Sequence, residues 1–194
     1  MRRFTVAVAA AVAGLLMSSW SAGAISLEDI NILTKKLPVG DDGRPLASAI
    51  PRETVAYSGP YKAGTIIIST AERRMYYVLG GNQAIKYGVG VGRPGFEWSG
   101  VKVISRKQLW PDWTPPAQML KRRPDLPRHM DGGLNNPLGA RALYLGSSLY
   151  RIHGSNEPQT IGQAVSSGCI RMTNEDVIDL FERARIGTKV VVQR

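Results

Sequence analysis

The sequence predicts a mainly β domain with one well-defined helix. Short runs rich in β-branched residues recur along the chain, such as "GTIIIST" (64–70) and "TKVVVQ" (188–193), and turn signals such as "GGN" (80–82) separate them. Runs of this length between turns are typical of the strands of a sheet. One segment, "TNEDVIDLFERARIG" (173–187), has instead the spacing of apolar residues that a helix requires.

The strands are expected one after another along the chain. Alternating apolar residues predict a strand at 73–80, antiparallel to the first, and a third at 83–91. The third contains "GVGVG", which is reminiscent of a nucleotide-binding loop, but Arg93-Pro94-Gly95 follows it and no helix start does, so we interpret it as a strand and turn. Further strands are expected at 100–108, 140–146, 149–154 and 188–193.

The predicted helix carries signals at both ends. Thr173 or Asn174 can cap its first turn, which is acidic, and Gly187 is the residue expected directly after its last turn. Its apolar stripe consists of Val177, Leu180, Phe181 and Ala184.

The first 24 residues have the features of a secretory signal peptide. Arg2 and Arg3 precede the apolar run Val6–Met17, and the small residues Ala22-Gly23-Ala24 predict cleavage after Ala24. The apolar run is too short for a membrane-spanning helix. We therefore expect export to the periplasm and no transmembrane segment after cleavage.

Cleavage would leave 170 residues, which we divide into a mostly irregular N-terminal arm (25–61) and a domain (62–194). It removes two arginines and no acid, so the formal charge falls from +10 to +8. Part of this charge is an ordinary solvated surface, but a basic exported protein also suits carboxylate-rich partners. The basic residues are scattered and no nucleic-acid-binding motif is present, so nucleic acid is not an expected partner.

One long connection interrupts the series of strands. Residues 109–139 contain six prolines, two tryptophans (Trp110 and Trp113) and at most a short helix near Gln118–Lys121. Connections of this length inside a domain are usually lids or binding loops. We expect a lid whose tryptophans contact the substrate, and the alternative is an excursion that packs only on itself.

Cys169 is the only cysteine, so this chain has no internal disulfide. A lone thiol in an oxidising compartment is a liability, which favours a working nucleophile. His153 ends an apolar strand, where its imidazole can accept the thiol proton. Arg171 shares the side of Cys169 in an extended segment, and its charge would favour the thiolate, hold a substrate carboxylate, or both.

Two other interpretations of Cys169 follow from the residues alone. It can be a small buried side chain with no chemical role. It can also ligate zinc together with His129, although no second cysteine and no close ligand spacing support a metal site. We expect neither a metal nor another cofactor.

The segment "IHGSNEPQTIGQAVSSGCIRMTNEDV" resembles the active-site motif of the L,D-transpeptidase (YkuD-like, ErfK-type) family: a His-Gly strand end, a spacer, and a Ser/Thr-x-Gly-Cys-x-Arg/Asn segment leading into a helix. The segments "NNPLGARALYLG", "STAERRMYYV" and "GVGVGRPGFEWSG" also resemble the family, so the resemblance covers about residues 62–194. It implies a β-sandwich-like catalytic domain, peptidoglycan stem peptides as substrates and a covalent cysteinyl acyl-enzyme.

The resemblance also implies roles for individual residues. Cys169 matches the nucleophile and His153 the base, and the carbonyl of Gly154 would orient the imidazole. The backbone N–H groups around Gly168 and Cys169 would form the oxyanion hole, and Arg171 matches a substrate-binding position. Ser167, which we expect among the substrate-binding residues, stands where many members have a second histidine, which leaves His153 as the one nearby base.

The leading hypothesis is an enzyme that cleaves tetrapeptide stems and passes the acyl group to an amine. The acceptor would be a diaminopimelate of another stem, giving a 3→3 cross-link, or a lysine of an outer-membrane protein. Water as acceptor would make the protein an L,D-carboxypeptidase. A catalytically silent wall-binding module has no use for a thiol, and a sortase-like enzyme separates Cys and Arg by more residues than Gly-Cys-Ile-Arg does.

Overall fold

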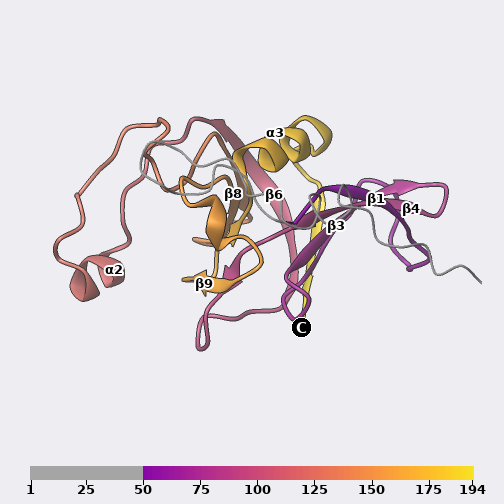
Figure 1. Cartoon of the computed structure of the whole chain (residues 1–194), viewed down its shortest axis with the longest axis horizontal. Coiled ribbons are helices and arrows are strands. Elements are labelled where there is room, and N and C mark those ends of the chain that lie inside the picture. Colours follow the sequence, from indigo (N-terminus) through magenta and orange to yellow (C-terminus); the bar gives the residue numbers. More distant parts are fainter. Residues whose placement is uncertain (1–49) are drawn as a thin grey trace, which may run out of the picture. The chain divides into compact units, whose positions relative to one another are not determined.

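The computed structural model describes residues 50–194, and the predicted signal peptide and most of the predicted arm lie outside the described residues. The described part is mainly β, as the sequence predicts. It contains a nine-stranded sheet of order β1-β4-β3-β2-β11-β6-β7-β8-β10 and a separate two-stranded sheet of β5 (Val91–Gly92) and β9 (Ala164–Ser166). Figure 1 shows how strongly the large sheet is curled.

The strands of the first half of the sheet form an antiparallel meander that the C-terminal strand extends. They are β1 (Glu53–Ala56), β2 (Ile66–Ser69), β3 (Arg74–Gly80), β4 (Gln83–Gly88) and β11 (Lys189–Gln193). The strand β11 is parallel to β2 and antiparallel to β6. β1 falls within the segment predicted as an irregular arm, and it pairs with β4 from Glu53 to Ala56.

The second half of the sheet carries the chemistry-bearing residues. Its strands are β6 (Gly100–Leu109), β7 (Arg141–Leu145), β8 (Arg151–His153) and β10 (Ile170–Arg171). β6 is long enough to pair with β11 through its first residues and with β7 through its last, with a register shift between Ile104 and Arg106. Such an irregularity bends a strand, so β6 is the shared strand about which the two halves turn.

Two α-helices and a short 3₁₀ helix, η1 (Pro158–Thr160), complete the described elements. The helix α2 (Ala117–Arg122) lies within the long connection, close to its predicted place. The helix α3 (Asn174–Arg183) packs on β7 and β8, and the Thr173 side chain accepts a hydrogen bond from the Asp176 N–H as an N-cap.

The predicted end of this helix is wrong. α3 stops at Arg183, because Ala184 adopts an extended conformation and is buried. Lys107 of β6 donates to the carbonyls of Phe181 and Ala184, so a neighbouring strand satisfies the last turn. Gly187 has its positive φ of 89° in the turn towards β11 rather than at the end of the helix.

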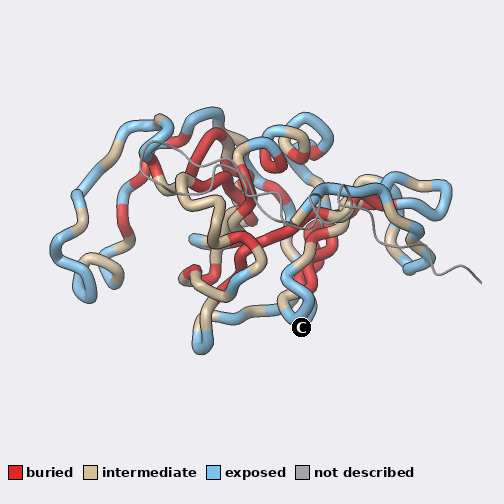
Figure 2. Tube along the Cα trace, viewed as in Figure 1, coloured by how far each residue is buried: buried red, intermediate tan, exposed pale blue. Residues whose placement is uncertain are grey.

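The hydrophobic core fills the space between the curled sheet and α3. Its fully buried side chains include Tyr87, Ile66, Ile68, Met75, Leu143, Ile152, Met172 and Leu180. Figure 2 shows that buried residues follow the sheet and the inner side of α3, whereas the far part of the 109–139 connection is exposed. The core therefore holds β8 and β10, and with them the ends that carry the predicted site, in a rigid framework.

Candidate active site

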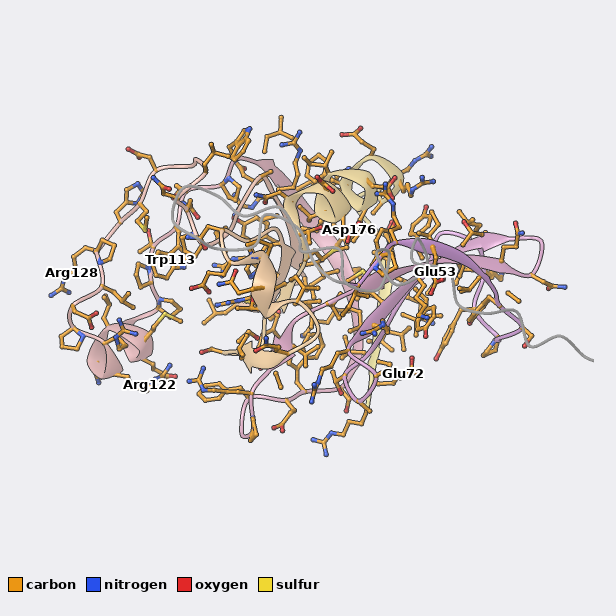
Figure 3. The ribbon with its side chains drawn as sticks, viewed as in Figure 1. Glu53, Glu72, Trp113, Arg122, Arg128 and Asp176 are labelled. Atoms are coloured by element: carbon orange, nitrogen blue, oxygen red, sulfur yellow. The ribbon has the colours of Figure 1, made fainter. Side chains whose placement is uncertain are left out.

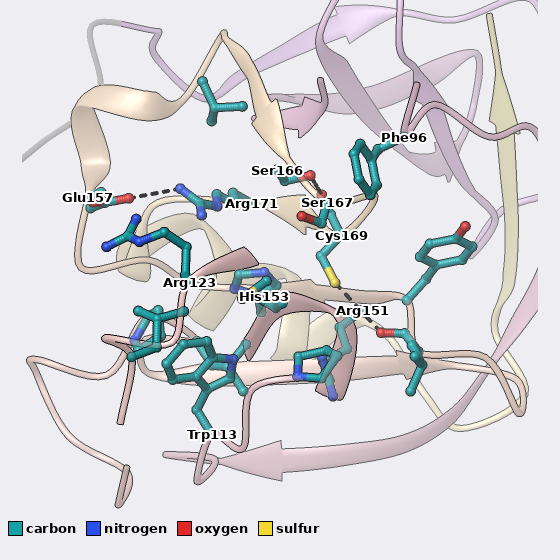
Figure 4. Close-up of a pocket in the computed structure, with 18 of the residues that line it drawn as sticks. Phe96, Trp113, Arg123, Arg151, His153, Glu157, Ser166, Ser167, Cys169 and Arg171 are labelled. Carbon is teal, nitrogen blue, oxygen red and sulfur yellow. Dashed lines mark hydrogen bonds and ion pairs between the residues drawn. The ribbon is translucent and has the colours of Figure 1, made fainter. Parts of the chain in front are cut away.

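Cys169 lies in the short connection between two strands, and these strands fix its position on both sides. It follows β9 (Ala164–Ser166) after a short turn and directly precedes β10. The strand β10 is parallel to β8, and Arg171 is in register with His153. Residues in register on parallel neighbours point to the same face, so the fold brings Cys169, His153 and Arg171 to one side of the sheet (Figure 4).

The turn that carries the thiol is held by hydrogen bonds from two directions. The Ser166 hydroxyl donates to the Cys169 carbonyl at 2.6 Å and accepts from the Gly168 N–H at 3.1 Å. The Trp98 indole N–H donates to the Gly168 carbonyl at 2.7 Å. Trp98 itself stacks on Tyr150, with ring centroids 4.6 Å apart. The backbone at Cys169 is thus positioned before any substrate arrives.

Gly168 is required by this geometry. Its φ of 103° is a conformation that residues with a side chain rarely adopt. A Cβ at this position would also lie 2.6 Å from Cε1 of Tyr150, well inside van der Waals contact. The glycine before the cysteine therefore allows both the turn and the close approach of the Tyr150 ring.

The His153 imidazole is buried and held in one tautomer. Its Nδ1 lies 2.6 Å from the Gly154 carbonyl oxygen. A carbonyl only accepts hydrogen bonds, so Nδ1 carries the proton and Nε2 has a free lone pair. Burial lowers the pKa of His153 from 6.5 to about 3, and the charges of Arg171 and Arg151 act in the same direction. At neutral pH the imidazole is a neutral base.

The Gly154 carbonyl is itself fixed by close packing. The Gly154 N–H donates to the Arg141 carbonyl at 3.0 Å. A Cβ on Gly154 would lie 2.3 Å from Oδ1 of Asn174, the first residue of α3. That same oxygen accepts a hydrogen bond from the Ala140 N–H. The start of α3 thus fixes the backbone that orients the imidazole.

Arg171 forms an ion pair with a residue that the sequence analysis did not single out. Its Nη1 lies 2.9 Å from Oε2 of Glu157 and 3.5 Å from Oγ1 of Thr160. Its backbone exchanges two hydrogen bonds with Gly90, within "GVGVG". The glycine-rich segment therefore serves as a neighbour of Arg171 in the sheet.

These residues open into one cavity of about 1010 Å³. Its lining includes His153, Ser167, Cys169 and Arg171 from the predicted site. The long connection contributes Trp113, which is 9% exposed, and residues of α2. Trp110 is not among the lining residues and is 43% exposed. Of the two tryptophans predicted to contact substrate, the structure places one at the cavity.

The connection is tied at its base and touches the opposite wall at its far end. Trp113 and Met130 exchange two backbone hydrogen bonds of 2.8 Å, which close the base. Arg122 of α2 lies over the Phe96 ring, 5.4 Å from its centroid. Figure 3 shows Trp113 near the base and Arg122 and Arg128 towards the far end. The connection thus lies along the cavity on the side away from the sheet.

His129 stands apart from this site. It is exposed, lies 3.3 Å from Asp131 Oδ1, and does not line the cavity. Among residues 50–194, no group of three or more His, Cys, Asp or Glu side chains could hold a metal ion. The same part of the chain has no helix long and apolar enough to cross a membrane.

Comparison with models of protein families shows to which family the chain belongs. Residues 63–192 match the YkuD family model, the L,D-transpeptidase catalytic domain. The chain belongs to this family. The family and the mainly β, sandwich-like fold class expected from the sequence are thereby confirmed.

Curated relatives agree with this membership. The probable L,D-transpeptidase ErfK/SrfK of Escherichia coli K12 is 38% identical over 136 residues, which is 66% of this chain and 43% of that protein. The probable L,D-transpeptidase YbiS of the same organism is 40% identical over 134 residues, 64% of this chain and 43% of that protein. The chain thus spans less than half the length of these two relatives.

Two solved structures are also similar. A chain from Brucella melitensis, described as a probable carnitine operon oxidoreductase, is 42% identical with a TM-score of 0.51, over 76% of this chain and 96% of that one. L,D-transpeptidase 3 from Mycobacterium tuberculosis is 17% identical with a TM-score of 0.54, over 67% of this chain and 60% of that one. The second likeness is one of fold alone.

Sequence reasoning missed three members of this L,D-transpeptidase domain's site. Trp98 holds the Gly168 carbonyl, Arg93 donates to the Ser167 hydroxyl at 3.0 Å, and Glu157 pairs with Arg171. Trp98 and Arg93 lie in "GVGVGRPGFEWSG", which resembles a family segment but whose sequence assigns no role in the site to either residue. Glu157 is the single acid between His153 and Arg171 in the sequence. Its position there is the one sequence signal that could have identified it as a partner of Arg171.

Proposed function

We propose that this protein is a periplasmic L,D-transpeptidase that acts on peptidoglycan tetrapeptide stems through an acyl-enzyme on Cys169. The observation that carries the proposal is the neutral imidazole of His153, with Nδ1 bound to the Gly154 carbonyl, in one cavity with the sole thiol. A nucleophile and an oriented base are the minimum that acyl transfer requires.

In the first half-reaction, Nε2 of His153 accepts the thiol proton while the Cys169 sulfur attacks the carbonyl between the third and fourth stem residues. Because the pKa of His153 is lowered to about 3, the resting imidazole is neutral and able to accept a proton. The developing thiolate then stabilises the imidazolium. The amide C–N bond breaks, the imidazolium protonates the leaving amine, and D-alanine departs.

The tetrahedral intermediate needs a hydrogen-bond donor for its oxyanion. The Gly168 N–H donates to the Ser166 hydroxyl, whereas the N–H of Cys169 has no acceptor within residues 50–194. We therefore assign the oxyanion to the Cys169 N–H. Gly168 contributes by giving the turn its conformation, with a φ of 103°.

In the second half-reaction an acceptor attacks the thioester. A stem amine gives a 3→3 cross-link, a protein lysine attaches that protein to the wall, and water gives carboxypeptidase activity. The chain from Brucella is described as an oxidoreductase, and such enzymes often bind a dinucleotide through a glycine-rich loop that opens a helix. The glycine-rich segment of this protein is not such a loop, because residues 90–92 pair with Arg171 and β9 and no helix begins there.

The covalent step is tested by intact mass after incubation with a tetrapeptide stem. An adduct of the acyl-tripeptide is expected on Cys169, and Cys169→Ala should give neither adduct nor turnover while keeping its circular dichroism spectrum. Turnover that survives in Cys169→Ala would rule out the mechanism. Mass analysis of muropeptides from treated cell walls then distinguishes 3→3 dimers, linked protein and tripeptides.

A further inference from the structure

The cavity is strongly basic apart from one side chain. Five arginines in the described part of the chain line it, namely Arg93, Arg122, Arg123, Arg151 and Arg171. Among the lining residues within 50–194, Glu157 is the one acid. Basic walls attract carboxylates and repel ammonium groups. An incoming amine, which is an ammonium ion at neutral pH, therefore meets favourable charge beside Glu157.

The ion pair of Glu157 and Arg171 keeps part of its hydrogen-bonding capacity. The pair uses Oε2 of Glu157 and Nη1 of Arg171. Oε1 of Glu157 and Nη2 of Arg171 have no hydrogen-bond partner within residues 50–194. The side chains of Glu157 and Arg171 are 40% and 22% exposed, and both residues line the cavity. The pair therefore offers one free acceptor and one free donor.

These free groups belong to residues that line the same cavity as the predicted nucleophile and base. Arg171 is in register with His153 and two residues from Cys169. Figure 4 shows the ion pair at the same cavity as the thiol and the imidazole. A group held by the pair is therefore on the same side of the sheet as the thiol and the imidazole.

We infer that Glu157 and Arg171 form the acceptor subsite, which binds an amine with a neighbouring carboxylate, that is, an α-amino-acid group. Glu157 Oε1 accepts from the ammonium and Arg171 Nη2 donates to the carboxylate. This rests on the proposed function, because it requires an acyl-enzyme. It selects a zwitterionic acceptor over an isolated amine through Arg171, which binds the carboxylate, whereas Glu157 binds the ammonium that both kinds of acceptor carry.

The step balances with the groups already named. The ammonium first releases one proton to solvent. Its nitrogen then attacks the thioester carbonyl, the new C–N bond forms and the C–S bond breaks. The second proton passes through Nε2 of His153 to the departing sulfur of Cys169. The products are an amide and the free thiol.

The test measures how the acyl-enzyme partitions between aminolysis and hydrolysis. The purified protein is incubated with a tetrapeptide stem and with either D-methionine or 3-(methylthio)propylamine, the same amine without its carboxylate. Wild type should favour D-methionine. Glu157→Gln should lower the ratio of aminolysis to hydrolysis about tenfold, the size that a charge-assisted hydrogen bond supplies.

Two variants serve as controls. Glu182→Gln removes an equal charge from α3, away from the cavity, and should keep the wild-type ratio. Glu157→Asp keeps the charge and should retain more aminolysis than Glu157→Gln. The melting temperature of each variant shows that it is folded.

Each remaining outcome has one meaning. A ratio in Glu157→Gln equal to that of wild type would overturn the inference. So would an equal loss in acylation and in aminolysis, because Glu157 would then support the site as a whole. Absence of the Cys169 adduct in the wild-type protein would instead overturn the proposed function.

Discussion

Burial of His153 should make the folded protein lose stability as the pH falls below about 6.5. The pKa of this imidazole is lowered from 6.5 to about 3 in the folded state, first by burial and then by Arg171. Between these values the unfolded chain binds a proton that the folded chain does not. Stability therefore rises with pH across this window, and it is lost as acid is added.

The size of the effect follows from the pKa difference. One pKa unit corresponds to about 1.4 kcal/mol, so protonation of His153 should cost the folded state about 3 kcal/mol at pH 4. The full shift of roughly 3.5 units would amount to about 5 kcal/mol, reached only below pH 3. Either figure is a large share of the free energy of unfolding, which is typically about 5–15 kcal/mol for a domain.

Urea unfolding at pH 7, 5 and 4 measures this directly. Other buried groups also titrate, including Asp176, whose pKa burial raises, so the informative quantity is the difference between wild type and His153→Gln. Wild type should lose about 3 kcal/mol more than His153→Gln between pH 7 and pH 4. His129→Gln, which removes the exposed histidine, should follow wild type. Parallel curves for wild type and His153→Gln would refute the reasoning.

Two further predictions concern the walls of the site. Trp113→Ala should lower peptide turnover about tenfold, because the ring positions a large substrate. Alkylation of the thiol by the small reagent iodoacetamide should change little. Trp110→Ala should have the smaller effect on turnover. Equal losses for peptide and iodoacetamide would show that Trp113 only stabilises the fold. Gly168→Ala should cost about 1–3 kcal/mol from its backbone conformation alone and slow acylation, as seen by urea unfolding and adduct formation. Gly133→Ala, where a Cβ meets no atom within 4 Å, is its control, and wild-type acylation in Gly168→Ala would contradict the geometry.

The longer elements could be predicted from the sequence because each contains its own periodic signal. The strands β2, β3 and β11 fall inside the predicted runs, and β6 extends one residue past its predicted run. The short strands β5, β9 and β10 have two or three residues each, too few for any alternation to be visible. The end of α3 was misjudged because Lys107, distant in sequence, satisfies its last carbonyls.

The site could be predicted only as far as its motif extends. Cys169, His153 and Arg171 were chosen by residue type and spacing, and the structure brings them to one cavity. Their partners could not be found in this way. Trp98 reaches the Gly168 carbonyl from 70 residues away, and only the folded sheet makes that approach visible.

The place of β11 in the sheet has a consequence for how the chain folds. This strand lies between β2 and β6, and its residue Val190 is in register with Ile66, more than a hundred positions earlier. Closing so long a loop is entropically unfavourable until the pairing forms, and such topologies fold slowly. Until then β2 and β6 each expose an unpaired edge rich in β-branched residues, ready to pair with another molecule. Assembly of the sheet thus competes with aggregation at a step that only its most C-terminal strand can complete.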